Sequence, residues 1–113
     1  MTRKEEVQKA IEFYHLCIEL LEKKANDYAN DDECFSNFTK TSEQCEIPIE
    51  KVFLMAMNIK HARLVELTKK TNNVEESKTD SLIDMANYAC LYALWLNDNT
   101  ETKRPNVTGD MLT

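Results

Sequence analysis

Four charged side chains have types and spacings that could bind a divalent cation or a phosphate group. Asp80 and Asp84 are four residues apart, which places both carboxylates on one side of a helix. Carboxylate oxygens are the ligands that Mg²⁺ prefers, and bound Mg²⁺ keeps waters that a phosphate can displace. Lys60 and Arg63 add a point charge and a bidentate fork, both of which suit phosphate. These residues predict a polar site.

Each of these groups also has a purely structural explanation. The helix dipole favours a carboxylate in a first helical turn, which would account for Asp80. Asp84 lies one turn further in, near Tyr88, and is open to three interpretations: a metal ligand, a partner of Lys60 or Arg63 in a buried ion pair, or a solvated side chain. The two basic side chains could equally extend to water along their aliphatic stems.

A second acidic pair lies in the first quarter of the chain. Glu19 and Glu22 form an E-x-x-E pattern, which could complete a divalent-metal box with the later aspartates. We therefore take Glu22, Asp80 and Asp84 as the candidate Mg²⁺ ligands, although such glutamate pairs are common on solvated helix edges. Neither histidine has a partner at catalytic spacing, and the sequence contains no glycine-rich phosphate loop.

The elements that must position these residues are expected to be helices. One glycine and two prolines in 113 residues argue against β-hairpins, and we predict an all-α, four-helix bundle-like domain with one shorter helix. The first helix is expected to begin at Thr2, which has capping-box spacing with Glu5. The helical domain is predicted over residues 1–97, followed by a flexible or loosely docked tail over 98–113.

The third and fourth helices carry the candidate site. Pro48 fits the first position of the third helix, and Ser77 or Thr79 is expected to cap the fourth. The fourth helix has apolar residues on both sides, so we expect it to pack on both. On one side Asp80, Asp84 and Asn87 are continued by Leu91 and Trp95; the other side is wholly apolar. The apolar side consists of Leu82, Ala86, Ala89, Ala93 and Leu96.

The first helix has a wider apolar surface than one neighbour needs. Apolar residues recur at alternating spacings of four and three, beside a second apolar stripe, and together they cover about half the circumference. The main stripe consists of Val7, Ile11, Tyr14, Ile18, Leu21, Ala25 and Tyr28. We expect this helix to be central in the fold and to pack against a second subunit, which predicts a homo-oligomer.

Composition limits the partners and the compartment. A net charge of −6 makes duplex nucleic acid a poor partner, because its backbone requires a basic surface. No window approaches eighteen apolar residues and the N-terminus lacks a signal-peptide pattern, so we expect a soluble, cytoplasmic protein without a membrane partner. None of the four cysteines forms a C-x-x-C pair, and Cys17 and Cys90 are expected to be reduced core residues.

Four groups of residues, in this order, resemble a family of phage proteins. They are Lys24-x-x-Asp27-Tyr28, Phe35-x-Asn37-Phe38, Lys60-x-x-Arg63 and Asp80-x-x-x-Asp84-x-x-x-Tyr88. The chain over about residues 20–96 resembles the nucleotide modification associated domain 1 family and its sister phage domains of unknown function. These are similar to the all-α nucleoside triphosphate pyrophosphohydrolases, which implies an all-helical fold and a place in phage nucleotide metabolism, in the cytoplasm of an infected bacterial host.

The resemblance also implies a ligand-binding set. It consists of Asp27, Tyr28, Asn37, Lys60, Arg63, Asp84 and Tyr88, with Asp80 beside them. The pyrophosphohydrolases, however, carry E-x-x-E followed closely by E-x-x-D, whereas here Glu19 and Glu22 are far upstream of the aspartates. Asp80 and Asp84 could still bind a metal together, because residues i and i+4 share a helix face. The inference of hydrolysis is weakened.

Three functions follow as hypotheses. The first is a binder that holds a small anionic nucleotide, including a cyclic signalling nucleotide, without turnover, as in phage evasion of host defence. The second is a Mg²⁺-dependent nucleoside triphosphate pyrophosphohydrolase, with Mg²⁺ as the one cofactor considered. The third is a non-catalytic helical adaptor in which the charged residues only pair with one another. Whether the protein is an enzyme stays open at this point.

Overall fold

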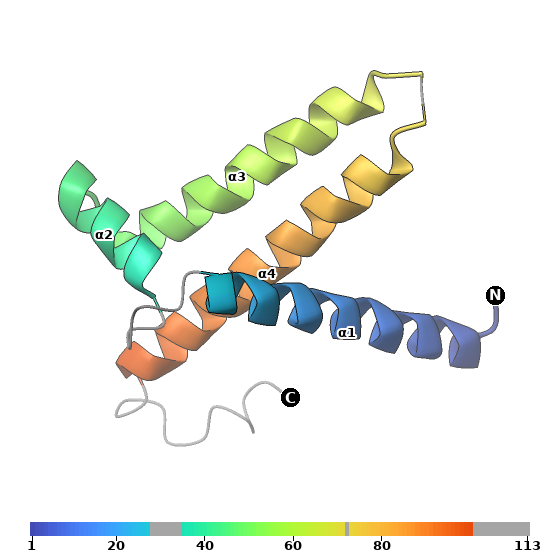
Figure 1. Cartoon of the computed structure of the whole chain (residues 1–113), viewed down its shortest axis with the longest axis horizontal. Coiled ribbons are helices and arrows are strands. Elements are labelled where there is room, and N and C mark those ends of the chain that lie inside the picture. Colours follow the sequence, from blue (N-terminus) through green and yellow to red (C-terminus); the bar gives the residue numbers. More distant parts are fainter. Residues whose placement is uncertain (28–34, 72, 101–113) are drawn as a thin grey trace.

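The computed structural model describes residues 1–27, 35–71 and 73–100 of the chain. Over these residues the fold is all-α, without strands, as the sequence predicts (Figure 1). The four helices are α1 (Arg3–Asp27), α2 (Ser36–Cys45), α3 (Ile49–Thr68) and α4 (Glu75–Thr100).

The start of α1 is fixed by the predicted capping box. The backbone N–H of Glu5 donates to Oγ1 of Thr2 at 3.1 Å, and the backbone N–H of Thr2 donates to Oε2 of Glu5 at 3.0 Å. These reciprocal bonds satisfy two donors that a helix start otherwise leaves to water. The prediction for this helix start is confirmed.

A sharp corner separates α2 from α3. Glu46 adopts a left-handed conformation with φ 56°, and the backbone N–H of Ile47 donates to the carbonyl of Ser42 at 3.1 Å. This arrangement is a Schellman motif, which closes α2. Pro48 follows as the residue capping α3, one position earlier than expected, because its fixed φ of −58° suits a helix entrance.

The start and end of α4 differ from the sequence prediction. The helix begins at Glu75, so Ser77 and Thr79 lie inside it instead of capping it. Two glutamates in the first turn favour this earlier start through the helix dipole. The helix also continues to Thr100, so residues 98–100 are helical where a tail was expected; residues 101–113 lie outside the described part of the chain.

The helices are arranged as an antiparallel hairpin with a projecting arm. α3 and α4 lie side by side, α2 packs at the beginning of α3, and α1 packs on α4 (Figure 1). α1 crosses α4, and its N-terminal half extends away from the other helices. The radius of gyration is 16.5 Å, against about 13 Å for a compact chain of this length. The arrangement is therefore more open than the expected bundle.

An aromatic cluster forms the core between α2, α3 and α4. Phe53 has no exposed surface and lies at its centre. Its ring stacks on Phe38 at a centroid distance of 4.3 Å and on Tyr92 at 5.1 Å, with Phe35 and Trp95 further out. Such aromatic pairs contribute beyond the apolar area that they bury. This cluster fixes α2 onto the hairpin.

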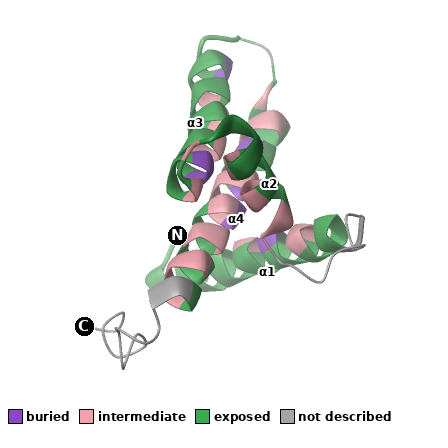
Figure 2. Ribbon diagram, turned by 90° about the vertical axis from the view of Figure 1, so that its left-hand side faces the viewer, coloured by how far each residue is buried: buried purple, intermediate pink, exposed green. Residues whose placement is uncertain are grey.

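Much of the remaining apolar surface is uncovered. Four residues of the predicted α1 stripe, Val7, Ile11, Tyr14 and Ile18, are between 45% and 61% exposed, and we call them the α1 seam. Figure 2 shows the exposed surface continuing along most of α1. Large apolar side chains are also exposed on the outer side of α3 and on α4. They are Leu54, Met55, Ile59, Val65, Leu82 and Leu94.

α4 packs mainly on one side, whereas packing on both sides was expected. Its predicted apolar side is largely exposed at Leu82, Ala89 and Ala93, whereas Ser81 and Asn87 are buried. A helix with apolar residues on both sides does not specify by sequence alone which side packs. The exposed side is left for other contacts. Every described helix is too short or too polar to cross a lipid bilayer.

Candidate functional site

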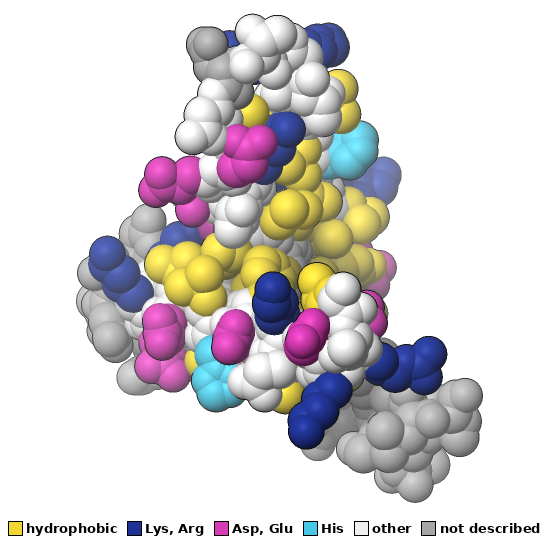
Figure 3. Space-filling model, turned by 90° about the vertical axis from the view of Figure 1, so that its right-hand side faces the viewer, with side chains coloured by type: hydrophobic (Ala, Val, Ile, Leu, Met, Phe, Trp, Pro, Cys, Tyr) yellow, Lys and Arg dark blue, Asp and Glu magenta, His cyan; other side chains and the backbone are white. Residues whose placement is uncertain are grey.

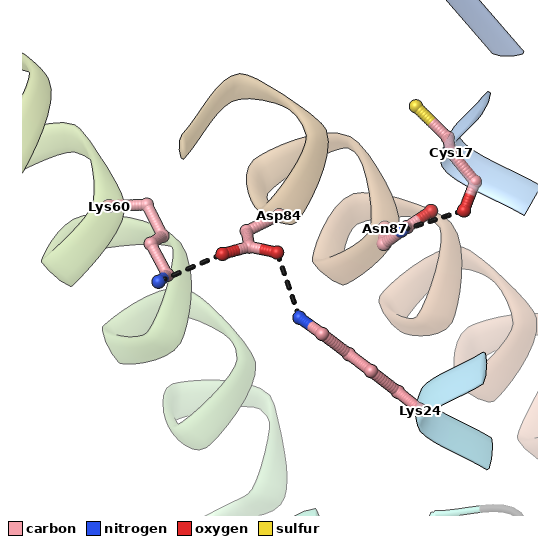
Figure 4. Close-up of polar contacts among 5 residues, drawn as sticks. All are labelled: Cys17, Lys24, Lys60, Asp84 and Asn87. Carbon is pink, nitrogen blue, oxygen red and sulfur yellow. Dashed lines mark hydrogen bonds and ion pairs between the residues drawn. The ribbon is translucent and has the colours of Figure 1, made fainter. Parts of the chain in front are cut away.

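Asp84 lies between two lysines from different helices. Its Oδ1 accepts a hydrogen bond from Nζ of Lys24 in α1, and its Oδ2 accepts one from Nζ of Lys60 in α3, both at 2.9 Å (Figure 4). We call Lys24, Lys60 and Asp84 the lysine–aspartate cluster. It joins α1, α3 and α4 at one point. The ion pair between Asp84 and Lys60 is one of the three arrangements that the sequence left open.

A buried amide beside the cluster helps to position α1. Nδ2 of Asn87 donates to the carbonyl oxygen of Cys17 at 3.0 Å, and both residues are buried (Figure 4). Asn87 follows Asp84 by three residues and Lys24 follows Cys17 by seven, so each pair shares one helix side. Two polar contacts therefore fix α1 on α4. An unpaired buried amide would cost about 1–3 kcal/mol, which favours this one position of α1.

The cluster brings two cations to one anion. The ammonium groups of Lys24 and Lys60 both face the Asp84 carboxylate, each at 2.9 Å. The exposed fractions are 19% for the Asp84 side chain, 27% for Lys60 and 51% for Lys24. The carboxylate is thus largely withdrawn from water while both lysines keep a solvated surface. An anion approaching from solvent would meet ammonium groups before the carboxylate.

The lysines govern the ionisation of Asp84. Burial alone would raise the pKa of this carboxyl, but hydrogen bonds and charges from Lys24 and Lys60 outweigh burial and hold the pKa below its ordinary value. A lowered pKa in the folded state means that the ionised form stabilises the fold. This stabilisation is present above the unfolded pKa, about 3.9 for aspartate, and is lost as the pH falls through the folded value.

The lowered pKa of Asp84 predicts that the stability of the fold depends on pH. We expect Asp84→Asn to lower the free energy of unfolding by about 1–2 kcal/mol at pH 7, since the cluster is intermediate between exposed and buried ion pairs. The difference from wild type should hold above the unfolded pKa of about 3.9 and shrink as the pH falls through the lower pKa of the folded state. Urea unfolding at fixed protein concentration measures it. A difference that is the same at pH 7 and pH 3 would contradict the ionic origin.

The other candidate residues are less closely assembled. Asn37, Arg63, Asp80 and Glu22 are exposed, and Arg63 follows Lys60 by one turn of α3. Tyr88 packs edge-on against Phe38 at a centroid distance of 6.1 Å, which attaches it to the aromatic core one turn after Asp84. Asp27 ends α1, but its side chain, like all of Tyr28, lies outside the described part of the structure.

The described residues do not bring the three candidate metal ligands together. No group of three or more His, Cys, Asp or Glu side chains among them is placed to hold a metal ion. Both oxygens of Asp84 accept hydrogen bonds from ammonium groups. A cation there would have to displace two lysines and would meet their repulsion.

Two residues of this region were not assigned by sequence reasoning. Lys24 belonged to the resembling residue groups but not to the implied ligand set, and Asn87 was noted only as lying on the same side as the aspartates. The seven-residue spacing of Cys17 and Lys24 was the available signal. Cys17 is buried and reduced as expected, and burial raises the pKa of its thiol. Cys90 is exposed, so its assignment to the core was wrong.

Comparison of the chain with protein-family models, curated proteins and solved structures found no match. This is an all-α protein in which a Lys–Asp–Lys ion-pair cluster joins three helices.

Proposed function

We propose that this protein binds a small anionic nucleotide without chemical turnover and does so as a homo-oligomer. The observation that carries the proposal is that the ammonium groups of Lys24 and Lys60, from two different helices, converge on the Asp84 carboxylate. Phosphate groups are bound by charge-assisted hydrogen bonds from lysine and arginine, which are about twice as strong as neutral ones. Lys24 and Lys60 supply such donors at a point where three helices meet.

Neighbouring residues support a nucleotide as the anion. Arg63 lies one turn from Lys60 on α3 and adds a planar donor. Tyr88 lies one turn from Asp84 and, with Phe38, provides aromatic rings near the cluster. Aromatic rings are common stacking surfaces for bases. The resemblance to phage nucleotide proteins favours the same class of ligand, including a cyclic signalling nucleotide sequestered on behalf of a phage.

The exposed apolar surface supports the oligomer. Single exposed apolar residues are ordinary, but those of the α1 seam recur along one face of a helix, which is the pattern of a contact surface. The α1 seam lies on the helix that the sequence singled out for subunit contact. We propose that subunits associate through α1.

Calorimetric titration with linear and cyclic nucleotides tests nucleotide binding. We expect one of them to bind with a dissociation constant below a millimolar, and Lys60→Met to weaken it about tenfold to a hundredfold through loss of a charged hydrogen bond. Lys69→Met is the matched control, because Lys69 caps the C-terminus of the same helix but pairs with Glu66 at 3.2 Å. If no nucleotide binds more tightly than millimolar, the proposal is wrong.

A specific observation favours a second candidate, the helical adaptor. Each oxygen of Asp84 already has its own ammonium partner, so the cluster is satisfied without a ligand. In that case a double-mutant cycle on Lys60 and Asp84 would show coupling in the free energy of unfolding, and no nucleotide would bind. The hydrolase hypothesis makes a different prediction: release of pyrophosphate from nucleoside triphosphates with Mg²⁺, abolished by Asp84→Asn.

A further inference from the structure

The N-terminal half of α1 lacks a neighbour in the described structure. Every residue from 1 to 12 is exposed, and the contact with α4 is made further along, where Cys17 is buried. Isolated helices of this length are marginally stable in water, so packing of an apolar face is what normally stabilises them. The exposed apolar face of this arm is the α1 seam (Val7, Ile11, Tyr14 and Ile18).

The seam has the geometry of a helix–helix contact. Its residues are spaced by four, three and four. This is the spacing of the a and d positions of a heptad repeat, through which two helices pack along their length. Branched Val7, Ile11 and Ile18 surround the larger Tyr14. We propose that the α1 seam packs in antiparallel orientation against the α1 seam of a second copy of this chain.

Charge selects the antiparallel orientation. Lys4 and Glu22 are eighteen residues apart, which is five turns, so they lie on the same side of α1 beside the seam. Neither has an ion-pair partner among the described residues. When Ile11 faces Tyr14 of the partner subunit and Val7 faces Ile18 of the partner subunit, Lys4 lies near Glu22 of the partner subunit, twice by symmetry. In parallel packing the same flank of the two helices lies at opposite edges of the contact, so Lys4 and Glu22 would not pair.

The face of α1 is smaller than a standard interface, so we expect the second copy also to contact the α3–α4 hairpin. α1 has 25 residues and is about 37 Å long and ~10 Å wide, so one face offers on the order of 400 Å². A standard interface buries about 800 Å² per partner. The rest is available where α1 meets the α3–α4 hairpin, because hydrophobic side chains gather there in a band between charged ones (Figure 3). This proposal rests on the homo-oligomer proposed above but not on nucleotide binding.

Zero-length carbodiimide cross-linking of the wild-type protein tests the orientation. Lys4 and Glu22 of one helix are about 27 Å apart along its axis, so a direct amide between them can form only between copies. We expect Lys4–Glu22 linked peptides in the dimer band. Lys4→Glu and Glu22→Lys should each raise the dimer dissociation constant about tenfold, and the double variant should restore it, since the pairs reform with reversed charge.

Lys9→Glu and Glu12→Lys are the control variants, because they change the same charges on α1 away from the seam. A monomer at all concentrations would overturn both this proposal and the oligomer proposed above. A dimer that gives no Lys4–Glu22 product and no rescue by the double variant would overturn the antiparallel packing alone. Failure of nucleotide binding in a protein that gives the product and the rescue would overturn only the ligand, so the two failures are distinguishable.

Discussion

Replacing Phe53 with alanine is expected to destabilise the protein by about 3–5 kcal/mol, the usual cost of removing a buried aromatic ring. Phe53 is fully buried, and its ring stacks on Phe38 from α2 and on Tyr92 from α4. The change removes the centre of the cluster that joins three helices. Urea unfolding followed by circular dichroism measures it, at fixed protein concentration because association adds to stability.

Lys51→Ala is the control for this variant. Lys51 is exposed on the same helix, and surface substitutions usually change the free energy of unfolding by less than about 0.5 kcal/mol. A loss below about 1 kcal/mol for Phe53→Ala would show that the aromatic cluster is not the core of the fold.

Ile11→Asp is expected to weaken self-association at least a hundredfold. Ile11 is near the middle of the α1 seam, so symmetric association would bury two unpaired carboxylates. Burying an unpaired charge is far more costly than the ~3 kcal/mol that a hundredfold change requires. Sedimentation over a range of concentrations measures the effect. We also expect lower helicity, because the N-terminal half of α1 would lose its partner.

Leu16→Asp is the matched control, since Leu16 is also an exposed apolar residue of α1 but is not part of the seam. If both variants dissociate equally, the contact surface is not the seam. If neither variant changes the mass, α1 does not mediate association.

The helices themselves could be predicted from the sequence because their signals are local. The Thr2–Glu5 capping box and the Pro48 boundary involve residues within one turn of each other, and the structure contains both features within one position. The α4 start at Glu75 was missed because acidic residues in a first turn compete with Ser and Thr as start signals.

The rotation of each helix about its axis could not be predicted in the same way. α4 is apolar on two sides, and packing against α1 and α3 decided which side became buried. Lys60 was correctly paired with Asp84 as one alternative, since an inward cation needs a counter-charge. The pairing of Lys24 with Asp84 was not predicted, because it depends on where α1 crosses α4, and the two residues are sixty positions apart in the chain. Arg63, predicted as an alternative partner of Asp84, is exposed instead.

The central claim is that the two ammonium groups of the lysine–aspartate cluster bind a nucleotide anion. Asp84→Asn keeps the size of the side chain and removes the negative charge that lies between these ammonium groups. The attraction of two unit charges a few ångströms apart is about 1–4 kcal/mol near a protein surface, so we expect binding at least severalfold tighter. Added salt should reduce the gain.

The decisive measurement is therefore a calorimetric titration of wild type, Asp84→Asn and the exposed control Asp80→Asn with the tightest-binding nucleotide of the panel. The proposal predicts tighter binding by Asp84→Asn and an unchanged dissociation constant for Asp80→Asn. Equal or weaker binding by an Asp84→Asn protein with wild-type helicity would contradict it.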